Sequence, residues 1–292
     1  MKRLIINADD FGYSLQRNRG IVECFKNKSI TSTSLLVNSV AMDDAVHHIR
    51  HLGIPAGVHL NLTEGLPVGR HFESLVDENG FFLGKLGFRD AIQQGSIQYQ
   101  DLRTEITAQL NAYYEAVGRK PTHVDGHQHV HVLPVVRDVF AKVLEQQGIR
   151  WTRLPAELDL DSCTWSSQGM RAFFNSVVEN AASSQEVFTK HSIRFPDGFV
   201  GLSTMGKEMT SDRVVQALTN IMNHNPATST IEWMVHPGYP TEIEGGCGSG
   251  ADDFSRSPDR FHEVEVLNNT HLKQHFKENR FKLVAFSNLN QK

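Results

Sequence analysis

The chain lacks several features that mark large classes of protein. Cysteine occurs only three times in 292 residues, at widely spaced positions, so we expect reduced thiols and no disulfide framework. No apolar run approaches the roughly 18 residues that span a membrane. The first residues reach Asp9 after too few apolar positions for a signal peptide, whose core needs about 7–15 of them. We therefore expect a cytoplasmic protein with no membrane partner.

The charge pattern and two missing motifs exclude further classes. The formal net charge is −4, and no block of like charge is longer than a few residues. A dedicated nucleic-acid-binding protein would carry a basic stripe, so no nucleic-acid partner is expected. The Gly-x-Gly-x-x-Gly signature of dinucleotide-binding folds and the Gly-x-Ser-x-Gly elbow of serine hydrolases are both absent.

Strand-like and helix-like segments alternate along the whole chain. Short apolar runs, such as 4–7 and 229–235, alternate about seven or eight times with amphipathic stretches long enough for helices, such as 101–117. Ser14 is a suitable N-cap for the helix predicted over 15–27. The alternation predicts an α/β protein with a parallel sheet and helices outside it. With so many units we expect a single-domain, deformed (β/α) TIM-like barrel with about seven or eight parallel strands.

Two long segments interrupt this alternation, at about 62–98 and 237–258. Both are rich in glycine and both leave the ends of predicted strands, so we expect them to form the rim of a pocket. Cys247 lies in the second insertion and is expected to be an exposed bystander. No repeat or linker is visible, which predicts one domain over 1–292. The remaining predicted strands are 32–37, 55–61, 122–124, 149–153, 199–201 and 281–286. The remaining predicted helices are 42–51, 135–147, 170–186, 211–223 and 270–279.

Residues with metal-binding or catalytic chemistry fall where the predicted strands end. The stretch His123-Val-Asp-Gly-His-Gln-His-Val-His131 holds four imidazoles and a carboxylate, and Asn7-Ala-Asp-Asp-Phe-Gly12 holds paired carboxylates. In barrels of this kind the carboxyl ends of the strands meet on one face and carry the active site. Imidazoles with carboxylates are the groups that a metal-assisted hydrolase needs. The residues at these ends are Asp9, Asp10, His59, Asp125, His127 and His236.

The paired aspartates suggest a division of roles. Consecutive residues of an extended strand point to opposite faces, so Asp9 and Asp10 can serve one site only at a frayed strand end. We expect Asp10 to bind a metal and Asp9 to act as a base. His59 taken alone would more often be a hydrogen-bonded core residue, but the two other clusters favour a ligand.

The remaining candidates leave alternatives open. The histidines of 123–131 could form a chelating strip on one strand face; we favour a strand that ends at Gly126, with only some rings converging and the others orienting ligands, contacting substrate or supporting the turn. His236 is a candidate general acid, with a structural histidine as the alternative. Arg153 and Arg194 are candidates for substrate contacts, with ion pairs inside the fold as the alternative.

Together these residues resemble the YdjC-like family of carbohydrate deacetylases, whose better-known members act on chitooligosaccharides. The resemblance covers nearly the whole chain. It rests on Asn7–Tyr13, Thr31–Asn38, Gly57–Thr63, Gly118–His131 and His236–Pro240. The Gly-Phe-Phe-Leu-Gly-Lys and Gly-Gly-Cys-Gly segments are similar to the animal branch of the family.

The resemblance implies a deformed (β/α) barrel with one divalent metal ion. By motif, Asp9 corresponds to the family's proposed base, and Asp10, His59 and His127 to its metal ligands. The family's metal is usually described as Mg²⁺; an Asp-His-His set suits Zn²⁺ better, so the metal stays open. The implied reaction is removal of N-acetyl groups from an acetylated oligosaccharide, with His236 protonating the leaving amine.

Two alternatives from other classes remain. A metal-dependent phosphoesterase would use the same ligand types with two or three metals. A catalytically silent interaction protein could keep the same fold. The oligomeric state is left open, including a homodimer.

Overall fold

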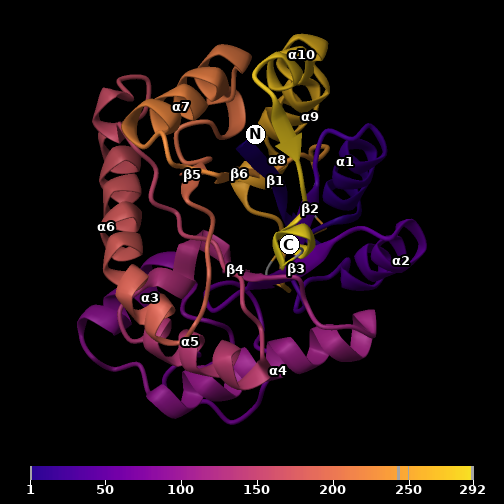
Figure 1. Cartoon of the computed structure of the whole chain (residues 1–292). Coiled ribbons are helices and arrows are strands. Elements are labelled where there is room, and N and C mark those ends of the chain that lie inside the picture. The colour runs from indigo at the N-terminus through magenta and orange to yellow at the C-terminus, as the bar shows by residue number, and fades with distance from the viewer. Residues whose placement is uncertain (1, 242–243, 249, 291–292) are drawn as a thin grey trace.

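In the computed structural model, which describes residues 2–241, 244–248 and 250–290, seven parallel strands form one curved sheet with helices around it (Figure 1). The strand order is β4-β3-β2-β1-β6-β5, and β7 also pairs with β1. The strands are β1 (Lys2–Phe11), β2 (Ser32–Leu35), β3 (Ala56–Leu60), β4 (Val124–Gly126), β5 (Gly198–Val200), β6 (Thr230–Val235) and β7 (Phe281–Leu283). The helices are α1 (Leu15–Lys26), α2 (Met42–Leu52), α3 (Gly84–Gln93), α4 (Tyr99–Val117), α5 (Val136–Gln147), α6 (Gln168–Lys190), α7 (Ser211–His224), α8 (Asp253–Arg256), α9 (Asp259–Asn268) and α10 (Thr270–Glu278).

The sheet curls into a half-barrel, and two single parallel bridges continue the curl. Val124 at the start of β4 pairs with Thr152, and Trp151 pairs with Arg194 in the segment that leads into β5. The strand predicted over 149–153 is therefore present only as these bridges. The predicted α/β fold, a deformed barrel with parallel strands, is confirmed.

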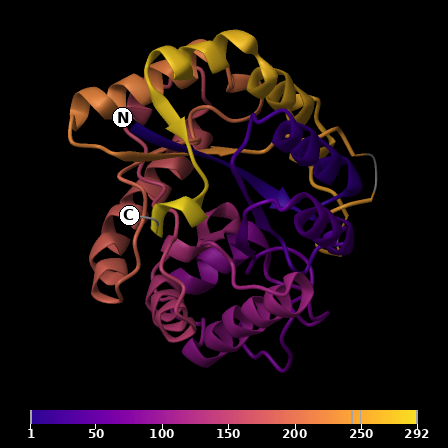
Figure 2. The same ribbon diagram turned by 45° about the vertical axis from the view of Figure 1, so that its right-hand side comes forward.

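Strand β1 forms the centre of the core. Figure 2 shows this indigo strand running through the interior between the yellow C-terminal helices and the magenta helices of the middle of the chain. Its residues Leu4, Ile5, Ile6 and Ala8 are fully or almost fully buried. A parallel strand covered on both faces requires this continuous apolar run, since neither face meets water. The central position of β1 brings its carboxyl end, with Asp9, into the middle of the strand ends.

All seven predicted helices are present in the described part of the chain, and three further α-helices there, α3, α8 and α9, were not predicted. Ser14 caps α1 as expected, since its side chain accepts a hydrogen bond from the Arg17 N–H. Helix α3 lies inside the insertion at 62–98. Its glycines have low helix propensity, so no clear helix signal is visible in this stretch of the sequence. Helix α9 buries Arg260 and Glu263 along with its apolar residues, so its sequence lacks a clear amphipathic pattern.

The two glycine-rich insertions meet above the strand ends. The Leu66 N–H of the first insertion donates to the Cys247 carbonyl of the second at 3.1 Å. A Cβ atom on Gly65 would lie 1.8 Å from the Cys247 carbonyl oxygen, so only glycine allows this approach. The prediction of an exposed Cys247 was wrong, because this packing leaves it 2% exposed.

Within the described part of the chain, none of the helices combines the length and the apolar character that a bilayer crossing demands.

Candidate metal centre and active site

Asp9 and Asp10 reach the same site because β1 is irregular at this point. Asp10 has a φ of 62°, and the register between β1 and β2 shifts between Ala8 and Phe11. Positive φ is uncommon outside glycine and concentrates at functional sites. The expected frayed end is wrong, since the strand continues to Phe11. The local irregularity turns consecutive side chains toward one site instead.

Asp10, His59 and His127 form a compact group of ligand atoms from three different segments. Asp10 Oδ1 lies 3.3 Å from His59 Nε2 and 3.1 Å from His127 Nδ1. One ligand atom from each residue lies within 4.8 Å of the others, and all three residues are buried. Asp10 belongs to β1 and His59 to β3, while His127 directly follows β4. The structure thus brings together all three predicted ligands.

The second nitrogen of each imidazole in this group faces a carboxylate. His59 Nδ1 lies 2.6 Å from Asp125 Oδ1, and His127 Nε2 lies 3.1 Å from Glu64 Oε2. Asp125 pairs with His59 across the register between β3 and β4. A carboxylate in the position of Asp125 orients a metal-binding imidazole and fixes its tautomer.

A second group, Asp9, His59 and Asp125, also has the spacing of metal ligands. Arg153 occupies it: its guanidinium lies 2.6 Å from Asp9 Oδ2 and 3.1 Å from Asp125 Oδ2. A cation would have to share these carboxylates with an existing positive charge. The Asp10 group is therefore the better candidate for a metal.

The charges around the Asp10 group favour a bound cation. Burial alone would raise the pKa of Asp10, but His127, His59 and Arg17 outweigh it and lower that pKa well below its usual value. Burial likewise opposes charge on the imidazoles, yet the carboxylates raise the pKa of His59 to about 9 and that of His127 to about 10. Protonated imidazoles thus balance the carboxylates in the metal-free protein. A divalent cation would supply the same balance.

Asp9 is held in one orientation by several donors. Arg153 Nη1 donates to Asp9 Oδ2 and Nη2 donates to Oδ1, at 2.6 Å each. Asn7 Nδ2 donates to Oδ1 at 2.8 Å, and Ser34 Oγ donates to it at 3.3 Å. The Oδ2 atom faces His236, whose Nε2 lies 3.9 Å away. The carboxylate oxygen nearest the candidate general acid is therefore also the one with fewer donors.

Of the two arginines proposed as substrate contacts, Arg153 lies in the site but is engaged by carboxylates, and Arg194 lies away from the site. Arg153 is 0% exposed and bound on all sides, since its Nε also donates to Glu232 Oε1 at 2.8 Å. The alternative given for it, ion pairs inside the fold, describes its environment. Arg194 is exposed and precedes β5, so it lies away from the carboxyl end of that strand. Its side chain lines a different cavity, together with Asp197.

His236 follows β6 and is fixed by its backbone. Its N–H donates to Glu263 Oε2 at 2.5 Å, and its carbonyl accepts from Arg17 and Arg260 at 3.3 and 3.2 Å. Burial lowers the pKa of its ring below the usual 6.5. The Nδ1 atom has no hydrogen-bond partner among the described residues. The ring is thus well placed beside Asp9 but neutral at pH 7.

The other three histidines of 123–131 do not join the metal group. Strand β4 ends at Gly126, and the chain then turns, with positive φ at Gln128 and His129. His123 stacks on Phe286 with ring centroids 3.8 Å apart. His131 Nε2 lies 3.1 Å from the Arg153 carbonyl oxygen, and burial lowers its pKa to about 4. The strand end at Gly126 was expected; the chelating strip is excluded by the turn.

Sequence reasoning missed Arg17 and Glu64. Arg17 is buried, and its guanidinium lies 3.4 Å from Asp10 Oδ2. Its position in the first turn of α1, three residues after the Ser14 cap, places it near the strand ends and could have indicated this role. Glu64 lies in the first insertion, where no periodic pattern fixes the direction of a side chain.

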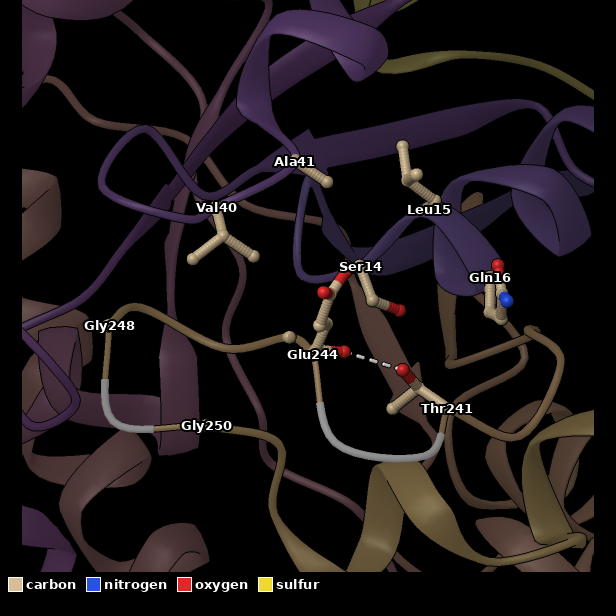
Figure 3. A pocket seen from close by; sticks show the side chains of 10 residues that line it. Ser14, Leu15, Gln16, Val40, Ala41, Thr241, Glu244, Gly248 and Gly250 are labelled. Atoms are coloured by element: carbon tan, nitrogen blue, oxygen red, sulfur yellow. Dashed lines mark hydrogen bonds between the residues drawn. The ribbon is translucent and has the colours of Figure 1, made fainter.

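A cavity of 470 Å³ opens where the second insertion passes the start of α1 (Figure 3). Ser14, Leu15 and Val40 line it from one side, and Thr241 and Glu244 from the other. Thr241 Oγ1 donates to the Glu244 carbonyl at 2.6 Å. This cavity therefore borders the turn that follows the paired aspartates.

A second cavity, of 350 Å³, has aromatic walls, one of which is Phe254, a neighbour of His236. Trp165, Phe174 and Phe254 contribute rings to its lining, and Lys207 contributes an amine. The Phe254 ring packs edge-on against the His236 ring, with centroids 5.8 Å apart. We call this space the aromatic cavity.

The fold and the site together define an α/β-barrel enzyme with paired carboxylates and imidazoles at the carboxyl ends of its strands. The chain belongs to the YdjC-like family, since the model of the family described as YdjC-like protein matches residues 3–278. The predicted family membership is confirmed.

Similar proteins support this assignment over the full length. The chain is 47% identical to the carbohydrate deacetylase of Mus musculus, over 99% of this chain and 96% of that protein. It is 30% identical to the chitooligosaccharide deacetylase of Yersinia enterocolitica, over 98% of both. The crystal structure of a candidate cellobiose-phosphate cleavage protein from Enterococcus faecalis V583 has the same fold, with a TM-score of 0.76 at 24% identity, over 99% of this chain and 98% of that one.

Proposed function

We propose that this chain is a metal-dependent carbohydrate deacetylase that hydrolyses N-acetyl groups of acetylated oligosaccharides. One observation carries the proposal: the ligand atoms of Asp10, His59 and His127 converge directly beside Asp9 and His236. The names of the full-length relatives supply the substrate class.

The donor set fits one divalent cation. Two imidazole nitrogens and one carboxylate oxygen leave room for water or substrate, as in catalytic metal sites. Imidazole ligands favour Zn²⁺ or a similar transition metal, whereas Mg²⁺ prefers oxygen ligands. A divalent ion bound there would act as a Lewis acid on the acetamide carbonyl and acidify a water molecule.

The residues around this ion would move the protons. Asp9 accepts a proton from the attacking water through Oδ2, while Arg153 and Asn7 hold the carboxylate in place. His236 then protonates the sugar amine as the C–N bond breaks, which gives acetate and the free amine. The imidazole is neutral at pH 7, so it first needs a proton. Asp9 Oδ2, 3.9 Å from Nε2, is the neighbouring group that has just received one.

The aromatic cavity suits the remainder of an oligosaccharide. Sugar rings combine an apolar face with polar edges, and the cavity is lined by the aromatic rings of Trp165 and Phe254 and by polar Ser203 and Lys207. Replacing Trp165 with alanine should raise KM for a trimeric or longer substrate and change KM little for a monosaccharide. Equal effects on KM for both substrates would show that this cavity does not bind the additional sugar units.

The direct test is acetate release from a panel of N-acetylated mono- and oligosaccharides, with the metal content measured on the same preparation. We expect acetate from at least one oligosaccharide and about one metal ion per chain. A metal-free preparation treated with chelator should be inactive and should recover with added Zn²⁺, Mn²⁺ or Mg²⁺. Phosphate release from sugar phosphates with two or three metals per chain would favour a phosphoesterase instead. Absence of all hydrolysis with a full metal site would favour a silent interaction protein.

A further inference from the structure

His127 is held at both ring nitrogens by carboxylates from different parts of the chain. Its Nδ1 lies 3.1 Å from Asp10 Oδ1, at the end of β1. Its Nε2 lies 3.1 Å from Glu64 Oε2, in the first insertion. The first contact belongs to the candidate metal group. The second has no part in the proposed reaction and requires its own explanation.

The insertion is built to place Glu64 there. The side-chain oxygen of Asn61 accepts hydrogen bonds from the backbone N–H groups of Thr63 and Glu64, at 3.0 Å each. Asn61 Nδ2 donates to the Glu64 carbonyl at 2.7 Å, which closes the turn. From the other insertion, a Cβ atom on Gly246 would lie 2.9 Å from Glu64 Oε1, so glycine leaves space for the carboxylate. The side chain is 15% exposed, which limits its freedom to leave His127.

The arrangement repeats what surrounds His59. That ring directs Nε2 toward Asp10 and Nδ1 toward Asp125, at 3.3 and 2.6 Å. His127 directs Nδ1 toward Asp10 and Nε2 toward Glu64, at 3.1 Å in both cases. Each ring therefore has one nitrogen for the metal group and one bound to a carboxylate outside it. In the second role a carboxylate accepts the ring N–H, fixes the tautomer and strengthens the ligand.

We infer that Glu64 is a positioning residue for the metal: its carboxylate accepts the Nε2–H of His127 and presents Nδ1 to the ion. This inference rests on the proposed metal-dependent function. It also gives the first insertion a role beyond forming a rim, because the insertion supplies a group that sets metal affinity.

The test compares metal affinity in Glu64→Ala, Glu64→Gln and the unsubstituted protein, by competition of Zn²⁺ with a chelator of known affinity. Loss of a carboxylate in this position typically weakens metal binding about 10–100-fold, which we expect for Glu64→Ala. Glutamine keeps an oxygen that can accept the Nε2–H, so Glu64→Gln should lose less than the alanine variant. Thermal unfolding of the metal-free variants checks that both remain folded.

Glu105→Gln is the matched control. Glu105 is a buried carboxylate that holds the same insertion, through the N–H groups of Val68 and Gly69 at 3.0 and 2.8 Å. Replacing Glu105 with glutamine weakens these contacts of the insertion, while no hydrogen bond to His127 is removed. The Zn²⁺ affinity of the Glu105→Gln variant should match that of the unsubstituted protein. If Glu105→Gln lost as much affinity as Glu64→Ala, the effect would come from the insertion as a whole, and the inference would fail.

Histidine labelled with ¹⁵N provides a readout that general loosening would not produce. In the zinc-bound protein, His127 should carry its proton on Nε2, and that proton should exchange faster with solvent in Glu64→Ala. A proton on Nδ1, or unchanged affinity in both Glu64 variants, would overturn the inference. Absence of zinc binding by the unsubstituted protein would instead overturn the proposed function, so the two failures are distinguishable.

Discussion

Arg153 donates two hydrogen bonds to Asp9, from Nη1 to Oδ2 and from Nη2 to Oδ1, at 2.6 Å each. The same guanidinium contacts Asp125 and Glu232, so one cation serves three carboxylates. This pairing sets the direction of Asp9 Oδ2 toward His236. A base that is oriented in this way can be tested separately from the group that orients it.

Replacing Asp9 with asparagine should reduce hydrolysis by about 10²–10⁴-fold while metal binding stays largely intact. The amide keeps the shape of the carboxylate and cannot accept the water proton. Acetate release and metal content measured on the same preparation check this. Near-normal turnover in Asp9→Asn would show that another group is the base.

Replacing Arg153 with lysine tests the orientation of that base. Lysine keeps the buried positive charge but cannot form the paired contacts of a guanidinium group. We expect kcat to fall with little change in KM or metal content, because the carboxylate loses its fixed direction. Steady-state kinetics distinguish this from a substrate contact, for which KM would rise. A rise confined to KM would return Arg153 to the substrate role.

Metal binding should strengthen as pH rises. In the metal-free protein the pKa of His59 is about 9 and that of His127 is about 10, so both rings are protonated at pH 7. A metal ion must displace these protons, so metal affinity should rise with pH until the pH exceeds both pKa values. At pH 7, binding should release about two protons per metal ion. Calorimetry in buffers of different ionisation enthalpy measures this number. In His127→Ala, occupancy and proton release should both fall; unchanged occupancy would point to the Asp9, His59 and Asp125 group.

The three cysteines should be dispensable for chemistry. All three are unpaired and buried, and burial raises the pKa of Cys163 to about 11 and that of Cys247 well above its usual value. A thiol that stays protonated is a poor nucleophile. The triple change of Cys24, Cys163 and Cys247 to serine should keep activity with some loss of thermal stability. Inactivation of Cys247→Ser alone, with the fold intact, would support a thiol mechanism.

The rule that strand ends share one face was enough to predict which distant residues meet. It brought Asp10, His59 and His127 together across more than a hundred residues, because alternation of strands and helices is visible in the sequence. It could not predict the irregularity at Asp10, since a positive φ there depends on pairing with β2. Nor could it predict the carboxylate of Glu64, because a turn held by Asn61 carries no periodic pattern.

The role of Arg153 illustrates a different limit. An arginine near a strand end has the same sequence context whether it faces substrate or three buried carboxylates. The arrangement of β1, β4 and β6 determines which of the two roles Arg153 has, since these strands supply Asp9, Asp125 and Glu232. Sequence reasoning therefore identified the residue but left its partners open.

His236 offers the sharpest test of the proposed proton transfers. An amine leaves a tetrahedral intermediate poorly unless it is protonated, and a positioned acid contributes about 10²–10⁴-fold. His236 Nε2 lies 3.9 Å from Asp9 Oδ2, and hydrogen bonds to Glu263 and Arg17 hold the backbone of His236 in place. Burial lowers the pKa of the ring below 6.5, so the ring is neutral at pH 7 and must take up a proton during the reaction, which Asp9 supplies in the proposed sequence of steps.

His236→Ala should therefore lose activity on the acetamide and keep its metal content. An activated acetyl ester such as 4-nitrophenyl acetate has a leaving group that needs no proton, so its hydrolysis should suffer much less. The matched control is His123→Ala, which removes another buried imidazole whose ring stacks on Phe286. It should affect stability and leave the ratio of amide to ester hydrolysis unchanged. Equal damage to both substrates in His236→Ala would mean that His236 binds substrate or supports the site, and that the amine receives its proton from another group.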